Sequence, residues 1–294
     1  MARSDTKQNL NYGTSQLLNL TRDSYLERTS RPFYAIAFLL PFILFYEIGT
    51  FLINTDELNR SQVRVVTFFW LQEWLKLLGY SGKLAWVAPP LVVVLILLGL
   101  QVASRKQWYF QFSDVIPMVV ECIFLAVPLI VLSLFINNPA VATQPASEVG
   151  AFIGQVSGFF VSGLQASSGG ESSLLANIVT GIGAGIYEEL VFRLILICVL
   201  MMVFQDLLGI SHKRAIIGAV IVSAALFSAH HHVVFINGRF TQSSKFCMEA
   251  FAFRTAAGVY FAALFAVRGF GITAGTHAFY DIIATLLNAL FFHA

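Results

Sequence analysis

Three ionisable side chains interrupt one of the most apolar stretches of the chain. Residues 188–193 read Glu-Glu-Leu-Val-Phe-Arg within an apolar run over residues 174–204. A charged side chain at the centre of a bilayer costs about 2.5–3.5 kcal/mol on insertion scales, so such residues indicate a functional site by default. Glu189 and Arg193 share a helical face at i and i+4, in the order that favours an ion pair. Glu188 points about 100° away without a charge partner in its own helix, which suits a general base.

Histidines in a later apolar segment are candidate partners for Glu188. The segment reads Phe227-Ser-Ala-His230-His231-His232, and Phe227 and His231 share one helical face. Adjacent histidines on a helix point in different directions. At most one or two of the three imidazoles can therefore reach Glu188.

A third apolar segment pairs an imidazole with a carboxylate. It reads His277-Ala-Phe-Tyr-Asp281, which places His277 and Asp281 one helical turn apart. A carboxylate at this spacing can fix the tautomer of an imidazole and raise its basicity. One such pair alone is typical of a structural contact, but three charged elements on three apolar helices indicate one shared site.

Composition identifies the environment of these residues. The chain has 294 residues, of which 57% are hydrophobic and only 12% charged, whereas soluble domains carry about 25% charged residues. We therefore expect an integral membrane protein. The net charge of +2 and the lack of a basic run argue against a nucleic-acid partner. Cys122, Cys198 and Cys247 lack metal-binding spacing and are expected to be small buried hydrophobes.

The apolar runs predict an all-α fold, a polytopic transmembrane helix bundle. Runs of about 20 residues, long enough to span a bilayer, cover residues 33–53, 85–103, 115–136, 174–204, 215–236, 249–267 and 272–292. Residues 65–78 suit an interfacial amphipathic helix, and residues 149–164 form either an eighth span or a re-entrant segment. The prediction is seven or eight spans in one domain over residues 33–294, preceded by a polar N-terminal tail over residues 1–32.

Basic residues set the expected orientation. Positive-inside counting favours a cytoplasmic N-terminus, because basic residues precede the first span: Arg3, Lys7, Arg22, Arg28 and Arg31. Arg239 and Lys245 then fall on the opposite side. Simple alternation of spans also leaves a gap of about 10 Å between His231 and His277 in a core of about 30 Å. A broken or partial hairpin within residues 237–248 would close that gap.

Small residues precede the carboxylates. Gly181, Gly183 and Gly185 have the small-residue spacing that lets membrane helices approach closely. The same string resembles a dinucleotide-binding loop, but no strand or βαβ unit surrounds it. Close helix packing is therefore the preferred interpretation.

Taken in order, the motifs Glu-Glu-x-x-x-Arg, Phe-x-x-x-His and His-x-x-x-Asp resemble the CPBP family of intramembrane proteases. This family includes the CAAX prenyl protease 2 and bacteriocin-processing (Abi) groups, and the resemblance covers about residues 176–288, with a protease-like core at about 174–292. It implies that Glu188 activates water with help from His231, while His277 and Asp281 hold the carbonyl oxygen or the developing oxyanion. It implies supporting roles for four further residues: Glu189, Arg193, Phe227 and His230.

Asp281 departs from the pattern of the eukaryotic prenyl-protein members, which have Asn at this position. Asn can donate a hydrogen bond to an oxyanion and an ionised Asp cannot. Asp281 therefore either carries a proton, orients His277, or joins Glu188, His231 and His277 as four ligands acceptable to zinc. No His-Glu-x-x-His helix is present. We therefore favour hydrolysis without a metal or other cofactor, and zinc remains the alternative.

The predicted reaction is hydrolysis of peptide bonds within the membrane. Its expected partners are membrane lipids and a membrane-associated protein or peptide, with or without a lipid anchor. The main rival is a proton- or ion-coupled transporter, in which Glu47 and Glu121 on other spans would extend a charge pathway. No inverted repeat typical of transporters is detected. A third possibility is a catalytically silent membrane scaffold or immunity protein.

Overall fold

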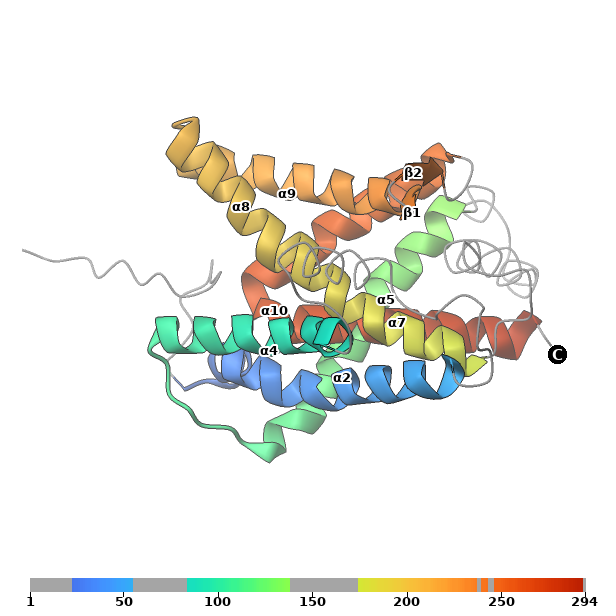
Figure 1. The fold of residues 1–294 in the computed structure, drawn as a ribbon, viewed down its shortest axis with the longest axis horizontal. Helices are drawn as coiled ribbons and strands as arrows, with labels where there is room; N and C mark the ends of the chain where they lie inside the picture. The colour runs from blue at the N-terminus through green and yellow to red at the C-terminus, as the bar shows by residue number, and fades with distance from the viewer. Residues whose placement is uncertain (1–22, 55–83, 138–173, 237–238, 243–245, 293–294) are drawn as a thin grey trace, which may run out of the picture.

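A computed structural model describes residues 23–54, 84–137, 174–236, 239–242 and 246–292, and most of these residues are helical (Figure 1). The helices are α1 (Tyr25–Thr29), α2 (Pro32–Asn54), α4 (Leu84–Ser104), the 3-10 turn η1 (Phe112–Asp114), α5 (Val115–Asn137), α7 (Leu174–Glu189), the π-helix η5 (Leu190–Ile195), α8 (Leu196–Met202), the π-helix η6 (Val203–Leu207), α9 (His212–His230) and α10 (Met248–Phe292). The strands are β1 (Val233–Ile236) and β2 (Arg239–Gln242). The predicted all-α class is confirmed.

The described helices have the length and apolar composition expected of an integral membrane protein. Stretches long and apolar enough to cross a bilayer cover Pro32–Ile53, Phe112–Ser133, Leu174–Leu207, His212–His230 and Ala250–Leu287, and Pro89–Ser104 is a shorter apolar helix. Because α10 consists of two helices joined at a kink, six of the seven predicted apolar runs correspond to described helices or half-helices. The run over residues 215–236 corresponds to α9 only as far as His230. The predicted segments 65–78 and 149–164, and residues 1–22 of the N-terminal tail, lie outside the described residues.

The reversal of α10 occurs at Gly269. Its φ of 74° and ψ of −179° lie in a region that is essentially restricted to glycine. An added Cβ would also come within 2.9 Å of the carbonyl oxygen of Ser30. Figure 1 shows α10 running away from the strands and then turning back toward the C-terminus. We call residues 248–268 the first limb and residues 270–292 the second limb.

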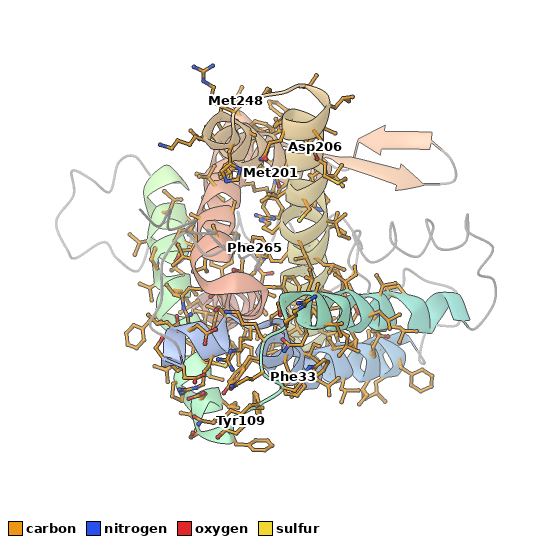
Figure 2. The ribbon with its side chains drawn as sticks, turned by 90° about the vertical axis from the view of Figure 1, so that its left-hand side faces the viewer. Phe33, Tyr109, Met201, Asp206, Met248 and Phe265 are labelled. Atoms are coloured by element: carbon orange, nitrogen blue, oxygen red, sulfur yellow. The ribbon has the colours of Figure 1, made fainter. Side chains whose placement is uncertain are left out.

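Large apolar side chains cover the outside of the bundle as well as its interior. Phe51, Phe112, Ile116 and Phe124 are between 70% and 84% exposed. Figure 2 shows side chains projecting outward along the helices, with Phe33 and Tyr109 at one end of the molecule and Met248 at the other. In water this surface would be unfavourable, but hydrocarbon solvates it, as expected for a lipid-facing exterior.

A close contact between α7 and the second limb of α10 positions the candidate carboxylates. A Cβ on Gly185 would lie 2.5 Å from the backbone nitrogen of Ala278, and a Cβ on Gly181 would lie 2.7 Å from the Cβ of Asp281. These two glycines are one turn apart and provide the close approach that their spacing predicts. Residues 188–189 follow one turn later on α7, so the contact brings them next to the motif on α10.

The predicted helix over residues 215–236 is wrong at its end. The helix α9 stops at His230, and β1 and β2 then pair antiparallel, from Val233↔Gln242 to Ile236↔Arg239. Hydropathy alone cannot separate an apolar strand from an apolar helix. The sequence nevertheless carries a hairpin signal, since Val-Val-Phe-Ile is rich in β-branched and aromatic residues and is followed by Asn237-Gly238. The expected hairpin lay within residues 237–248, whereas the paired strands begin at Val233.

Candidate active site

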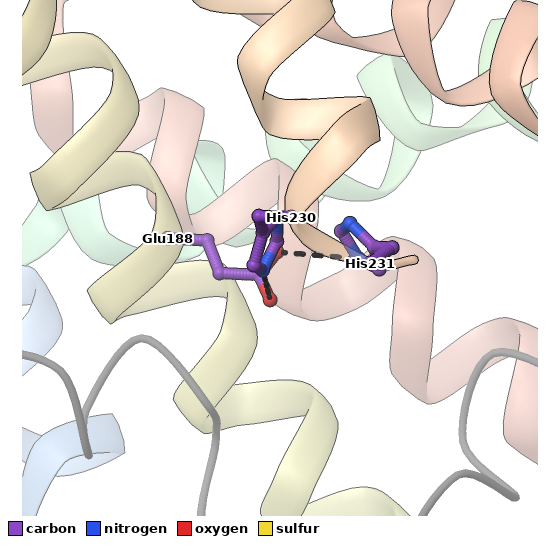
Figure 3. Close-up of side chains that lie close together, drawn as sticks. All are labelled: Glu188, His230 and His231. Atoms are coloured by element: carbon purple, nitrogen blue, oxygen red, sulfur yellow. Dashed lines mark ion pairs between the residues drawn. The ribbon is translucent and has the colours of Figure 1, made fainter. Parts of the chain in front are cut away.

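Glu188 projects from the last turn of α7 toward two imidazole rings at the end of α9 (Figure 3). Its Oε1 lies 3.5 Å from Nε2 of His230, and its Oε2 lies 3.9 Å from Nε2 of His231. Glu188 and His230 are buried, whereas the side chain of His231 is 23% exposed. Two of the three adjacent histidines thus lie near the carboxylate, within the limit that helical geometry sets.

The backbone fixes the tautomer of both rings. Nδ1 of His230 lies 2.7 Å and Nδ1 of His231 lies 2.9 Å from the carbonyl oxygen of Phe227. A carbonyl can only accept, so both Nδ1 atoms donate, and a neutral ring then presents the lone pair of Nε2 to Glu188. Two lone pairs facing a carboxylate repel it unless a proton, a water molecule or a cation lies between them. Oε2 of Glu188 has no hydrogen-bond partner within the described part of the chain.

Glu189 links the first motif to the third. Its Oε2 lies 3.0 Å from Nε of Arg193, which is the ion pair that the i, i+4 spacing predicts. Its Oε1 accepts a hydrogen bond from Nδ1 of His277 at 2.8 Å. Nε2 of His277 faces Oδ2 of Asp281 at a longer 3.6 Å. Glu189 therefore makes the shorter contact that orients His277, which was one of the three roles considered for Asp281.

Aromatic rings hold the two halves of the site together. The guanidinium of Arg193 lies 4.2 Å from the ring centroid of Phe227. The same ring is 5.1 Å from that of His231 and 6.1 Å from that of His277. On the other side, Phe261 stacks on His277 at 4.5 Å. Phe227 thus packs between the two histidines that simple span alternation placed at opposite ends of the membrane.

A π-helix immediately follows the two carboxylates. In the widened turn of η5, the N–H of Leu196 donates to the carbonyl of Val191. The hydroxyl of Ser223 on α9 donates to the carbonyl of Phe192 in the same turn, at 2.6 Å. Single π turns within helices are frequent at functional sites. The sequence carries no compositional signal for this turn, so it was missed.

Near the site, His232 contacts Arg254, a residue that was absent from the sequence-based candidates. His232 is buried although it follows the end of α9, and its Nε2 lies 3.5 Å from Nη1 of Arg254 on α10. The available signal was the charge of Arg254 within the apolar run over residues 249–267. The mean hydropathy of this run predicts a span despite the charge, so Arg254 was not considered as a site residue.

The potential metal ligands that the described residues gather differ from the predicted set. Glu188, His230 and His231 each offer one ligand atom, and these atoms lie within 4.8 Å of one another. The predicted set was instead Glu188 and His231 with His277 and Asp281. Two imidazole nitrogens and a carboxylate oxygen suit zinc, and a carbonyl contact at Nδ1 is a common way to orient such histidines.

Comparison with known proteins identifies the class and then the family. Residues 170–283 match the family model described as type II CAAX prenyl endopeptidase, Rce1-like. This region contains the paired carboxylates, both histidine motifs and the strands, and its class is that of intramembrane proteases. The match confirms the resemblance found in the motifs: over residues 170–283 the chain is similar to the CPBP, or CAAX protease, family. No curated protein and no solved structure matches the chain.

Proposed function

We propose that the protein hydrolyses peptide bonds of membrane-associated proteins within the bilayer, with Glu188 as the general base. The observation that carries this proposal is the buried carboxylate facing two Nε2 atoms at 3.5 and 3.9 Å. A water molecule between them would donate to the carboxylate and to an imidazole, which removes the repulsion between these acceptors. Glu188, assisted by His231, would then take a proton from this water as it attacks the substrate carbonyl.

His230 belongs in the same step. Its Nε2 is closer to Glu188 than that of His231. Its buried ring is held by Phe227, whereas His231 is partly exposed and can contact substrate. We assign His230 the task of orienting Glu188 and the water molecule.

The oxyanion is assigned to the other half of the site. Since Nδ1 of His277 donates to Glu189, Nε2 is the nitrogen left to face a substrate oxygen. A protonated His277 would donate through Nε2 to the developing oxyanion, and a protonated Asp281 would add a second donor. The proton taken by Glu188 returns to the leaving amine, which completes hydrolysis.

Hydrolysis without a metal remains the favoured mechanism. If zinc is bound, Glu188, His230 and His231 would hold it, and the ion would polarise the substrate carbonyl. That arrangement would use as a ligand the carboxylate that the reaction needs as a base. The reaction with and without a chelator separates the two mechanisms.

The expected substrate has an apolar or lipidated segment, because the site lies within membrane helices. Basic residues from three separate segments gather around α1 at one end of the described structure: Arg28, Arg31, Lys106 and Arg268. This clustering supports a cytoplasmic orientation of that end under the positive-inside rule. In a bacterium the membrane would be the plasma (inner) membrane.

The rival functions predict different results in the same preparation. Glu121 is bound by Arg268 and Tyr25, and Glu47 accepts a hydrogen bond from Tyr187 at 3.2 Å. These contacts explain the presence of both carboxylates structurally, so a transport pathway is not needed to account for them. A transporter would nevertheless move protons or ions in sealed vesicles without peptide, and a scaffold would show neither activity.

The deciding experiment uses the full chain in lipid nanodiscs with quenched fluorescent peptides that carry apolar or prenylated segments. Glu188→Gln should abolish cleavage. Asp206→Asn, which makes the same change at an exposed carboxylate, should leave cleavage intact. The proposal fails if the wild-type protein cleaves none of the peptides, or if Glu188→Gln cleaves them at the wild-type rate.

A further inference from the structure

Arg254 lies on the face of α10 that the candidate site uses. One turn later, Gly258 packs against α9, where an added Cβ would lie 2.9 Å from Cα of Ala224. Almost one turn further on, Phe261 stacks on His277. Positions 254, 258 and 261 share one helical face. The side chain of Arg254 therefore starts from the surface that α10 presents to the catalytic motifs.

The guanidinium of Arg254 also acts on the site electrostatically. Its charge interacts with Glu188 and with His231. Arg254 and His231 are both only partly buried, in contrast to Glu188, Glu189 and Arg193. The partly exposed side of the catalytic cluster therefore carries a positive charge that the proposed chemistry does not use.

His232 adds a second donor beside Arg254. Its Nε2 faces Nη1 of Arg254 at 3.5 Å. When this nitrogen accepts from the guanidinium, the ring proton is on Nδ1. Nδ1 is buried and has no hydrogen-bond partner among the residues that the structure describes. A buried donor without a partner is costly, and a ligand that accepts from it removes that cost.

The charge of the catalytic cluster indicates what this pair would bind. Ionised Glu188 would repel an approaching carboxylate, whereas Arg254 would attract it. A guanidinium presents donors in a fork that matches the two oxygens of a carboxylate. We propose that Arg254 and His232 form a subsite for a substrate carboxylate near the scissile bond, which is either the C-terminus of the chain or an Asp or Glu side chain. This inference rests on the proposed proteolytic function.

The test compares peptides that differ only in this carboxylate. Four otherwise identical apolar peptides carry a free C-terminal carboxylate, a C-terminal amide, an internal Glu with an amide end, or an internal Gln with an amide end. For the wild-type full chain in nanodiscs, kcat/KM for one carboxylate peptide should exceed that of its neutral partner about tenfold, mainly through KM, which is typical of one charge-assisted hydrogen bond. The preferred pair identifies the source of the carboxylate.

Variants connect the preference to the subsite. Arg254→Gln should reduce the ratio between carboxylate and neutral peptides to about one, and Arg254→Lys should keep part of it, because Lys retains the charge without the fork. Arg214→Gln, at an exposed position near the start of α9, should keep the full ratio. The ratio is insensitive to partial unfolding, since a loss of folded protein lowers both rates together.

The proposal is overturned if the wild-type protein cleaves both members of each pair equally, or if Arg254→Gln keeps the wild-type ratio. Cleavage of none of the four peptides would count against the proteolytic function itself, and the inference would fall with it. Cleavage of all four at similar rates would leave the proteolytic function standing and remove only the carboxylate subsite.

Discussion

Two clusters of charged side chains lie in the same bundle, and they differ in how closely each charge is paired with a partner. At the end near α1, Arg268 donates to both carboxylate oxygens of Glu121, to the carbonyl of Leu26 at 2.9 Å and to the hydroxyl of Thr29 at 2.8 Å. In the candidate active site, Glu188 faces imidazole nitrogens at 3.5 and 3.9 Å. We call the first group, together with the pairs around Glu27 and Asp114, the α1 cluster.

The α1 cluster is built from paired charges with short contacts. Arg28 makes two hydrogen bonds of 3.1 Å to Asp114, and Tyr34 donates to the same carboxylate at 2.9 Å. Removing charges from water is costly, and only good geometry with additional hydrogen bonds offsets that cost. The α1 cluster meets this requirement, so its charges hold α1 against the bundle.

The active-site cluster retains unmet hydrogen-bonding capacity. Buried polar atoms in native proteins nearly always have a partner, and an exception indicates a ligand, an ion or a water molecule. Oε2 of Glu188 is such an exception within the described residues. Hydropathy marks Glu121 and Glu188 alike as intramembrane charges, and only their contacts distinguish a structural carboxylate from a catalytic one.

The largest predicted effect is the loss of activity on changing Glu188. Glu188→Gln removes the base and should lower kcat by about 10²–10⁴-fold. Because Oε2 of Glu188 has no hydrogen-bond partner among the described residues, the thermal unfolding midpoint of the variant should stay within a few degrees of the wild-type value or rise. Parallel rate and unfolding measurements in detergent check both. If the variant is less stable but its folded molecules cleave at the wild-type rate, Glu188 has a structural role instead.

The opposite result is expected for the α1 cluster. Arg268→Met leaves the partly buried Glu121 with only the hydrogen bond from Tyr25 among the contacts described above. It should lower the unfolding free energy by less than the about 3–5 kcal/mol that breaking a fully buried pair costs, with little change in kcat per folded molecule. Adding Glu121→Gln removes the uncompensated charge and should restore much of the stability. A double-mutant cycle measures the coupling. Loss of kcat at unchanged stability would contradict the distinction between the two clusters.

The parts of the site that the sequence could predict are those defined within one helix. Glu189 with Arg193, and His277 with Asp281, follow from i, i+4 spacing, and Gly181 predicts close packing of α7 because small residues permit it. The contact between Glu189 and His277 joins residues 88 positions apart. Helical periodicity contains no information on such a pair, so the sequence could offer only Asp281 as a carboxylate that orients His277, as one of three possible roles for that residue.

The fold was predictable to the same extent. Apolar runs identified the helices because the bilayer fixes their length and composition. The helix prediction was wrong after His230. There, hydropathy indicated a helix, whereas the β-branched residues followed by Asn-Gly indicate a hairpin. The α1 cluster could not be predicted from the sequence either, because Arg28 and Asp114 are 86 positions apart and only tertiary packing brings them together.

A smaller effect is expected where α7 meets the second limb of α10. Gly185→Ala places a methyl group against backbone atoms of Ala274 and Ala278, at 2.8 and 2.5 Å. Overpacking of this kind costs about 1–3 kcal/mol, and the shift of α7 should lower kcat by moving Glu188 relative to α9. Gly99→Ala is the matched control, since no atom lies within 4 Å of its added Cβ. If both variants lose the same activity, close packing at Gly185 does not position the site.

The smallest effect is a pH dependence that belongs to the α1 cluster. Burial opposes ionisation of Glu27, but hydrogen bonds from Arg31 and Lys106 outweigh it and lower the pKa of this carboxyl from 4.5 to about 2. A lowered folded-state pKa contributes stability that is complete above pH 4.5 and is lost as the pH falls toward about 2. Lys106 is partly exposed, so solvent screening limits the contribution to about 1 kcal/mol.

Glu27→Gln isolates this contribution. The variant should be less stable than the wild-type protein by about 1 kcal/mol at pH 7, and the difference should disappear as the pH approaches 2, where Glu27 of the wild-type protein takes up its proton. Chemical unfolding of the full chain in detergent across this range measures the difference, with Asp206→Asn as the control. Because Glu27 lies in α1, the pH profile of cleavage should be unchanged in this variant. A shifted cleavage profile would instead show that the α1 cluster and the catalytic cluster titrate together.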